Sequence, residues 1–277
     1  MNFKIVSDSS SNLLQFTGVN YAAVPLKIRS AKAEYVDDAT LDVAAMVEEL
    51  KNTKGKSGTS CPNIQEWIDA FGGAKEVFAI TITSNLSGSC NAARQAAELY
   101  MAQDPEAKVY VVDSLSAGPE LILLVETLAQ LHQDGCEFEQ KVEFIQQYQK
   151  NTHLLFCLES LTNLARNGRV NPAVAKIAGV LGIRVVGKAS DVGTLQQLHK
   201  CRGEKKALET MFAEMEAMGF AGGKVRLDHC QNPDAAKALK DRILEKYPYC
   251  DIQIGQCRGL CSFYAEQGGL MLGFESE

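Results

Sequence analysis

The sequence predicts an α/β protein with two domains: an N-terminal parallel, doubly wound sheet domain over residues 1–150 and a smaller C-terminal α/β domain with a mixed sheet over residues 151–277. Three observations support this prediction. Short apolar runs alternate with helical patterns up to residue 150, and parallel strands need such helical crossovers. Polar turns follow several of these runs directly. After residue 151 the units become shorter, and two of them form a hairpin pattern.

The first half contains four apolar runs that predict strands, and apolar residues at helical spacing predict the helices between them. Pro25 lies inside the second run, so part of that run is expected at a sheet edge or a strand end. The predicted strands cover residues 3–6, 21–28, 77–83 and 109–112, and the predicted helices cover residues 41–50, 63–71, 89–101, 120–132 and 137–150.

The second half combines shorter apolar runs with three helical patterns. Residues 191–193 separate two runs that we predict as hairpin partners. The predicted strands cover residues 153–158, 183–186, 194–201, 224–227, 251–255 and 270–274, and the predicted helices cover residues 172–181, 204–218 and 233–246.

Polar turns follow the predicted strands after Val6, Thr83 and Val112. In a doubly wound sheet, ligands bind beyond the carboxyl ends of the strands. Because the three turns occupy those ends, we expect them to converge on one crevice. The topology therefore predicts a binding site there.

Two hydroxyl-rich turns precede predicted helices, namely Thr59-Ser60-Cys61-Pro62 and Ser84-Asn85-Leu86-Ser87-Gly88. Free N–H groups and the positive dipole end of a helix favour a carboxylate or phosphate, and hydroxyls add donors without adding charge. The two turns together predict the walls of one small anion pocket. The alternative is that both are ordinary helix N-caps, since Ser and Thr commonly begin helices.

The composition argues against several classes of protein. With 277 residues, 46% of them hydrophobic, the chain can bury a full core. Its net charge of −6 offers no basic surface, so we expect no nucleic-acid partner. The N-terminus turns polar too early for a signal peptide, and no apolar stretch reaches the length of about 18 residues that a membrane span needs. We therefore expect a soluble, cytoplasmic protein.

Cysteine and histidine spacing predicts no metal site. The nine cysteines are scattered from Cys61 to Cys261, as is typical of reduced thiols in the cytosol. Cys257 and Cys261 lack the Cys-x-x-Cys spacing, and the four histidines are dispersed. No cluster of metal ligands can be assembled from these residues.

Nucleotide and hydrolase motifs are also incomplete, so we predict no cofactor and no catalytic residue. Residues 182–188 match most of a phosphate-binding loop, but Ala189 stands where a Ser or Thr would hold magnesium. No Gly-x-Gly-x-x-Gly occurs. Ser87 lies between Asn85 and Ser89, where the nucleophile elbow of an α/β-hydrolase has glycines.

Six motifs follow one another along the chain: Ser7-Asp8-Ser9-Ser10, Val24-Pro25-Leu26, Thr59-Ser60-Cys61-Pro62, Leu86-Ser87-Gly88-Ser89, Asp113-Ser114 and residues 161–170. Their order and spacing resemble the DegV family of bacterial fatty-acid-binding proteins, from the first strand to about Lys206. The resemblance implies a two-domain α/β carrier, without catalytic activity of its own, that buries one long-chain fatty acid in a tunnel between its domains. It also implies a partner, a separate ATP-dependent fatty acid kinase subunit, which receives the carboxyl end and makes an acyl phosphate.

The resemblance also assigns the carboxylate site. Thr59 and Ser87 match the threonine and serine that bind the fatty acid carboxylate, and Ser60 and Gly88 belong to the same two elements. Neutral hydroxyls hold a carboxylate by charge-assisted hydrogen bonds, while each buried CH₂ of the tail contributes about 0.8 kcal/mol. We therefore expect the tail to supply the affinity and the head group to set the orientation of the ligand.

Arg169 and Arg202 match two family arginines that the resemblance assigns to phosphate or kinase contact. Two apolar segments, residues 121–125 and 177–181, are candidates for the tunnel wall. The alternative for both segments is ordinary core packing.

The chain departs from the family near its C-terminus. The family usually carries a His-x-Gly-Pro-Gly element there, whereas residues 264–269 read Tyr-Ala-Glu-Gln-Gly-Gly, with Tyr264 as the nearest polar ring. Two other functions therefore remain open. One is a small-molecule hydrolase that uses Ser87, and the other is a family member that binds a different carboxylate or only a protein partner.

Overall fold

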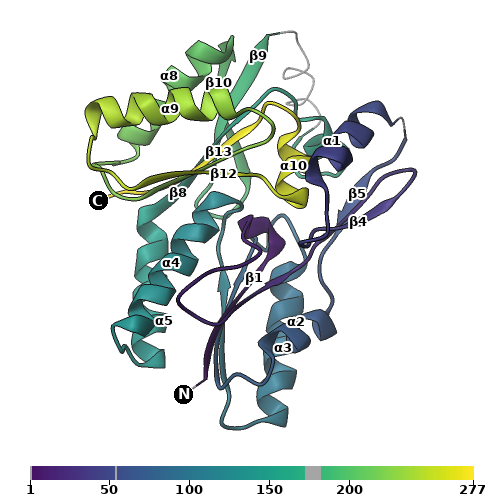
Figure 1. Ribbon diagram of the computed structural model, residues 1–277, viewed down its shortest axis with the longest axis vertical. Helices are drawn as coiled ribbons and strands as arrows, with labels where there is room; N and C mark the ends of the chain where they lie inside the picture. The colour runs from purple at the N-terminus through teal and green to yellow at the C-terminus, as the bar shows by residue number, and fades with distance from the viewer. Residues whose placement is uncertain (1, 54, 172–181) are drawn as a thin grey trace.

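The computed structural model describes residues 2–53, 55–171 and 182–277 (Figure 1). Three sheets organise the chain, in the orders β2-β1-β6-β7, β4-β3-β5 and β10-β9-β8-β13-β11-β12. The helix predicted over residues 172–181 lies outside the described residues. No helix in the described part of the chain combines the length and apolar character that a bilayer crossing requires.

The first sheet is entirely parallel, as predicted. Its strands are β1 (Phe3–Asp8), β2 (Tyr21–Val24), β6 (Glu76–Thr81) and β7 (Lys108–Asp113). Four helices cover its two faces: α2 (Ile64–Phe71) and α3 (Ser89–Gln103) on one, α4 (Pro119–Gln133) and α5 (Phe138–Tyr148) on the other (Figure 1). Alternate residues of β1 contact the helices on opposite faces of the sheet, since Ile5 packs with α4 and Val6 packs with α2 and α3.

A small antiparallel sheet was not predicted. It consists of β3 (Lys27–Arg29), β4 (Glu34–Val36) and β5 (Gly58–Ser60), and α1 (Val43–Asn52) follows β4. Pro25 divides the apolar run over residues 21–28 between two sheets, because proline cannot donate to a ladder. Thr59 and Ser60, expected in a turn, instead form the end of β5.

The ordinary N-cap interpretation of the two hydroxyl-rich turns is wrong. Asn63, not Thr59 or Ser60, caps α2, with a side chain that accepts from the Glu66 N–H. Helix α3 begins after Gly88 without any side-chain cap. Gly88, not Ser87, is the N-cap residue of α3, although the Ser87 hydroxyl accepts from the N–H of its first residue, Ser89.

The second half forms a six-stranded mixed sheet, as predicted, in which only the β11–β12 pair is parallel. Its strands are β8 (Thr152–Leu158), β9 (Ile183–Ala189), β10 (Leu195–Arg202), β11 (Val225–His229), β12 (Ile252–Gln256) and β13 (Leu270–Glu275). Helices α8 (Glu204–Ala217) and α9 (Pro233–Lys246) cover its outer face. Within the described residues, the remaining short helices are α6 (Thr162–Arg166), α10 (Gly259–Ala265) and the 3₁₀ turns η1 (Ser9–Ser11) and η2 (Gln149–Asn151).

The strands of the first two sheets lie before residue 151, and those of the third sheet lie after it. We keep the two-domain division at residue 151 as a proposal on this basis. Side-chain contacts nevertheless join the two halves of the chain. Arg226 of β11 is buried and donates to both carboxylate oxygens of Glu126 in α4, at 2.7 Å each.

Glu120, at the start of α4, is a buried carboxyl between the two halves. The Thr152 hydroxyl donates to its Oε1 at 2.8 Å. Burial disfavours the ionised carboxylate and raises the pKa of Glu120 to about 7. Glu120 therefore keeps a proton that the unfolded chain would lose near its ordinary pKa of 4.5.

Glu120→Gln is expected to flatten the pH dependence of the free energy of unfolding. In the wild type, the contribution of Glu120 is fully present below pH 4.5 and is lost as the pH rises through about 7. Between pH 5 and pH 8 the variant should gain about 2.5 kcal/mol relative to the wild type. Urea denaturation at the two pH values checks this, and identical pH profiles for both proteins would contradict it.

Candidate functional site

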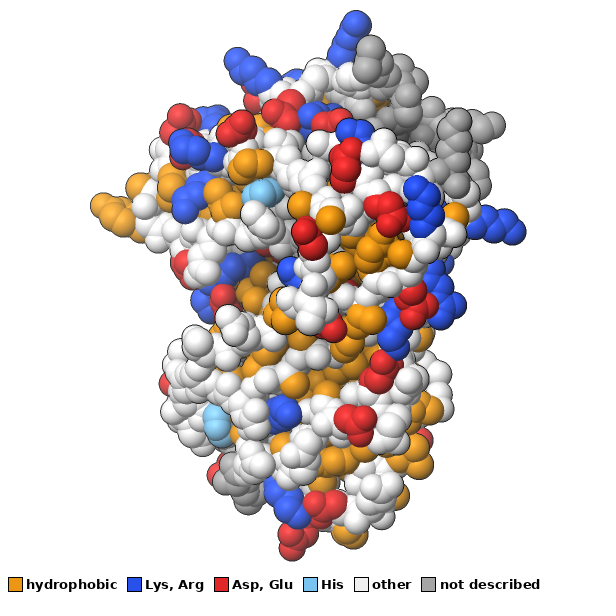
Figure 2. Space-filling view, turned by 45° about the vertical axis from the view of Figure 1, so that its right-hand side comes forward, with side chains coloured by type: hydrophobic (Ala, Val, Ile, Leu, Met, Phe, Trp, Pro, Cys, Tyr) orange, Lys and Arg blue, Asp and Glu red, His pale blue; other side chains and the backbone are white. Residues whose placement is uncertain are grey.

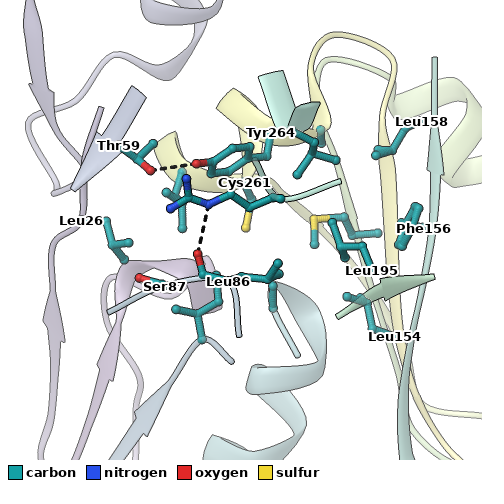
Figure 3. Close-up of a pocket in the computed structure, with 17 residues that line it drawn as sticks. Leu26, Thr59, Leu86, Ser87, Leu154, Phe156, Leu158, Leu195, Cys261 and Tyr264 are labelled. Atoms are coloured by element: carbon teal, nitrogen blue, oxygen red, sulfur yellow. Dashed lines mark hydrogen bonds between the residues drawn. The ribbon is translucent and has the colours of Figure 1, made fainter. Parts of the chain in front are cut away.

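An apolar pocket lies where the three sheets approach one another (Figure 3). On the face that carries α1 and α10, hydrophobic side chains gather in the waist between the upper and lower parts of the molecule (Figure 2). The pocket lining includes Ile82 and Ala117, from the segments that follow β6 and β7. Of the three turns predicted to converge, those after β6 and β7 therefore reach the pocket, whereas the turn after β1 is not part of the lining.

One side of the pocket is a wall of large apolar side chains. Leu154, Phe156 and Leu158 of β8 point into it, together with Leu195 of β10 (Figure 3). The β8 residues alternate, because Leu155 and Cys157 lie on the opposite face with α8 and α9. This strand thus supplies both the outer core and the pocket wall.

The opposite side of the pocket carries hydroxyls. Thr59 of β5 and Tyr264 of α10 share a hydrogen bond between their hydroxyl oxygens, which are 2.8 Å apart. Ser87, in the loop between β6 and α3, lies on the same side as Thr59 and away from the β8 wall (Figure 3). The Ser87 Oγ accepts a hydrogen bond from the Ser89 N–H at 3.3 Å. The two predicted hydroxyls, Thr59 and Ser87, therefore line one pocket.

Arg169 also lines the pocket and brings a positive charge to it. Its Nε–H donates to the carbonyl oxygen of Leu86 at 3.1 Å, and a second guanidinium nitrogen donates to the carbonyl oxygen of Asn167. The bond to Leu86 ties the guanidinium to the loop that carries Ser87. A cation held beside the hydroxyls favours an anionic head group at this side.

Three other predicted site residues are absent from the pocket lining. Ser60 pairs with Lys27 at the end of β5, and Gly88 is exposed at the start of α3. Arg202 is exposed at the end of β10. A Cβ at Gly88 would lie 3.2 Å from the Cys61 Sγ, so the two hydroxyl-rich turns do meet.

Asp8 fixes the loop that presents Ser87. Its Oδ2 accepts from the Ser89 hydroxyl at 2.6 Å and from the Ile82 N–H at 3.0 Å, while Oδ1 accepts from the Ser10 hydroxyl. Burial raises the pKa of Asp8, and these hydrogen bonds oppose the rise. Asp8, at the end of β1, therefore holds in place the loop that carries Ser87.

Sequence reasoning missed the role of α10, which contributes Cys261 and Tyr264 to the pocket. Burial raises the pKa of the Cys261 thiol well above its ordinary range, so it stays neutral and donates to the Ser10 carbonyl oxygen at 3.3 Å. The only sequence signal was the place of Tyr264 where the DegV pattern has histidine. The apolar segment at residues 121–125 does not line the pocket, and its Leu121 and Leu124 belong to the core between α4 and the first sheet.

No group of three His, Cys, Asp or Glu side chains that could hold a metal ion is found within residues 2–53, 55–171 and 182–277. The second tunnel-wall candidate, residues 177–181, lies outside these ranges.

Comparison with known proteins gives consistent results. A family model described as "Uncharacterised protein, DegV family" matches residues 2–277. A DegV domain-containing protein of Streptococcus pneumoniae is 43% identical, with 99% of each chain covered. The structure of the S. pneumoniae Fatty Acid Kinase (Fak) B3 protein loaded with linoleic acid is 42% identical, covers 100% of both chains and superposes with a TM-score of 0.98. A DegV family protein from Eubacterium eligens loaded with heptadecanoic acid is 41% identical over 99% of this chain and 100% of that one, also with a TM-score of 0.98.

Proposed function

Because this chain belongs to the DegV family, we propose that it binds one long-chain fatty acid, with the acyl chain in the apolar pocket and the carboxylate at Thr59 and Ser87. The observation that carries the proposal is the separation of polar and apolar side chains within the pocket. Its hydroxyls lie on one side, opposite a wall of leucine and phenylalanine side chains (Figure 3). Such a pocket suits a molecule with one polar end and a long apolar body.

The head-group side offers donors but no competing negative charge, since none of the described residues that line the pocket is Asp or Glu. A carboxylate would replace the mutual hydrogen bond of Thr59 and Tyr264 with charge-assisted bonds from both hydroxyls. The N-terminus of α3, a helix of 15 residues without a side-chain cap, adds a favourable dipole beside Ser87. We therefore include Tyr264 among the carboxylate ligands.

We further propose that the protein acts as a carrier for a separate ATP-dependent fatty acid kinase subunit. The similarity to a protein named for fatty acid kinase supports this role. In this proposal Arg169, beside the head group, and Arg202, exposed on β10, contact the phosphate or the kinase. The chemistry would occur on the partner, and the carrier would only bind and present the carboxylate.

The nine free cysteines support a reducing, cytoplasmic location for this carrier. The net charge of −6 supports a function without nucleic acid. The hydrolase alternative that uses Ser87 is less favourable, because the described pocket lining contains no His, Asp or Glu that could act as a base.

Native mass spectrometry of protein purified from a bacterial host tests the proposal. The expected result is one acyl chain per protein, removed by denaturation and identified as a long-chain fatty acid. Empty protein that also fails to bind added palmitate or oleate would contradict it. A different bound carboxylate would instead favour the alternative of a changed ligand.

A further inference from the structure

The short helix α10 forms part of the pocket wall and supplies the Tyr264 hydroxyl to it. Leu260, Cys261, Tyr264 and Ala265 all line the pocket, although the helix spans only Gly259–Ala265. The Tyr264 hydroxyl reaches Thr59 from this helix. The position of α10 therefore decides whether a tyrosine donor stands beside the threonine donor.

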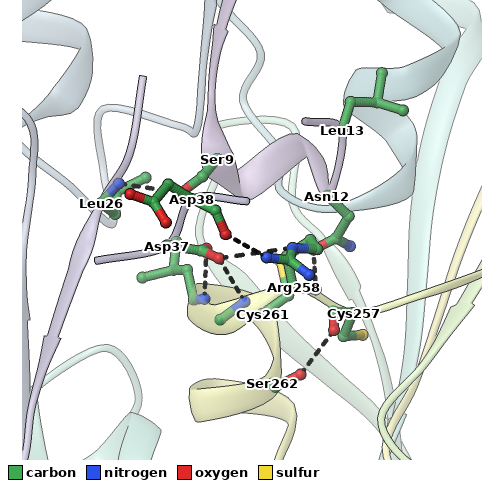
Figure 4. A network of polar contacts seen from close by, with 12 residues as sticks. Ser9, Asn12, Leu13, Leu26, Asp37, Asp38, Cys257, Arg258, Cys261 and Ser262 are labelled. Carbon is green, nitrogen blue, oxygen red and sulfur yellow. Dashed lines mark hydrogen bonds and ion pairs between the residues drawn. The ribbon is translucent and has the colours of Figure 1, made fainter. Parts of the chain in front are cut away.

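Helix α10 has no side-chain cap from its own sequence, and a residue from the other half of the chain takes that place. Asp37, just after β4, accepts hydrogen bonds from the N–H groups of Gly259 at 2.7 Å and Leu260 at 2.8 Å (Figure 4). The first N–H groups of a helix have no intrahelical partner, so a carboxylate binds them well. Asp37 is 1% exposed, which leaves water no access to replace it.

The approach of Asp37 depends on a glycine. A Cβ at Gly259 would lie 2.7 Å from the Asp37 Oδ1 and 2.6 Å from the Leu41 Cδ2. Any larger residue at this position would push the carboxylate or the helix away. The absence of a side chain at Gly259 thus allows the Asp37 carboxylate to reach the start of α10.

Neighbouring contacts support the same junction. The Arg258 N–H donates to the Asn12 Oδ1 at 2.8 Å, and the Arg258 guanidinium donates to the Asp38 carbonyl oxygen (Figure 4). The Asn12 amide in turn donates to the Asp228 Oδ2 at 2.6 Å. These bonds orient the residues around Asp37, but none of them involves the pocket.

Asp37 directly follows β4 of the small sheet that contains Thr59. The Asp37 N–H donates to the carbonyl oxygen of Leu26 at 2.9 Å, next to β3, and Ile28 of β3 pairs with Thr59 of β5. A shift of α10 relative to Asp37 is therefore also a shift of Tyr264 relative to Thr59. One buried contact fixes both sides of the hydroxyl pair.

We propose that Asp37 is a positioning residue for the carboxylate site, because its contact with the start of α10 places the Tyr264 hydroxyl against that of Thr59. This inference rests on the proposed fatty acid function. Asp37 itself does not touch the ligand, and its effect on binding passes through Tyr264.

A double-mutant cycle with Asp37→Asn and Tyr264→Phe tests the proposal, with the affinity of delipidated protein for oleate as the readout. Each single variant is expected to weaken binding about tenfold, the loss that follows from one hydrogen bond to a charged group. In the Tyr264→Phe background, Asp37→Asn should weaken binding less than about twofold, because the donor that it positions is already gone. A merely structural role would reduce binding equally in both backgrounds, and that additive result would overturn the proposal.

Asp38→Asn is the matched control, since the Asp38 carboxylate accepts hydrogen bonds from the N–H and hydroxyl of Thr40, away from α10, and the oleate affinity of this variant should be unchanged. If Asp37→Asn does not fold, Gly259→Ala disturbs the same contact from the helix side and enters the cycle in its place. Failure of the wild type to bind oleate would overturn the proposed function itself. Binding by the wild type together with additive losses would overturn only the role of Asp37.

Discussion

Shortening the fatty acid from sixteen to eight carbons is expected to weaken its binding by about four to five orders of magnitude. Eight methylenes leave the apolar pocket, and each contributes about 0.8 kcal/mol when buried. The wall formed by Leu154, Phe156 and Leu158 supplies the surface that replaces water. Isothermal titration calorimetry of delipidated protein with saturated acids of even chain length measures this dependence.

The same slope should appear in Thr59→Val, because the head and the tail contact separate residues and their contributions add. The chain-length series measured with the wild type and the one measured with Thr59→Val therefore serve as controls for each other. An affinity that does not change with chain length would show that the tail stays in water. That result would contradict the assignment of this pocket to an acyl chain.

Removing the Thr59 and Ser87 hydroxyls together should also have a large effect. Thr59→Val combined with Ser87→Ala is expected to weaken oleate binding at least about a hundredfold, since each hydrogen bond to a carboxylate contributes about 1.5–3 kcal/mol. Both replacements keep nearly the original side-chain volume, so the free energy of unfolding should change little. Competition binding and urea denaturation of the same samples measure the two quantities.

Ser60→Ala is the matched control for this experiment. Ser60 is adjacent to Thr59 and half-buried, but it does not line the pocket. Its oleate affinity should equal that of the wild type. Oleate methyl ester provides a second control, because it lacks the charge and should discriminate poorly between the double variant and the wild type. Equal losses of oleate binding in Ser60→Ala and in the double variant would contradict the assigned roles.

The sequence contains enough information for the two large sheets and their helices. Buried strands such as β1 and β6 appear as continuous apolar runs, and the polar residues after them mark the carboxyl ends. The family resemblance then directed attention to Thr59 and Ser87, which both line the pocket. Local patterns were sufficient for these elements because apolar runs bounded by polar turns mark the strands, and apolar residues at helical spacing mark the helices.

The small antiparallel sheet and α10 could not be predicted, for a physical reason. The strands β3, β4 and β5 have three residues each, too few to show a period. Helix α10 depends on Asp37, which is 222 residues away in sequence from Gly259. The Thr59–Tyr264 pair is likewise 205 residues apart. Contacts at such separation are set by tertiary packing and leave no local signal.

A crystal structure of the protein with bound oleate tests the central claim most directly. The account predicts the carboxylate oxygens within about 3 Å of the Thr59 and Ser87 hydroxyls, with the acyl chain running toward Leu154 and Phe156. An acyl chain in the opposite direction, or oleate bound outside this pocket, would contradict the account.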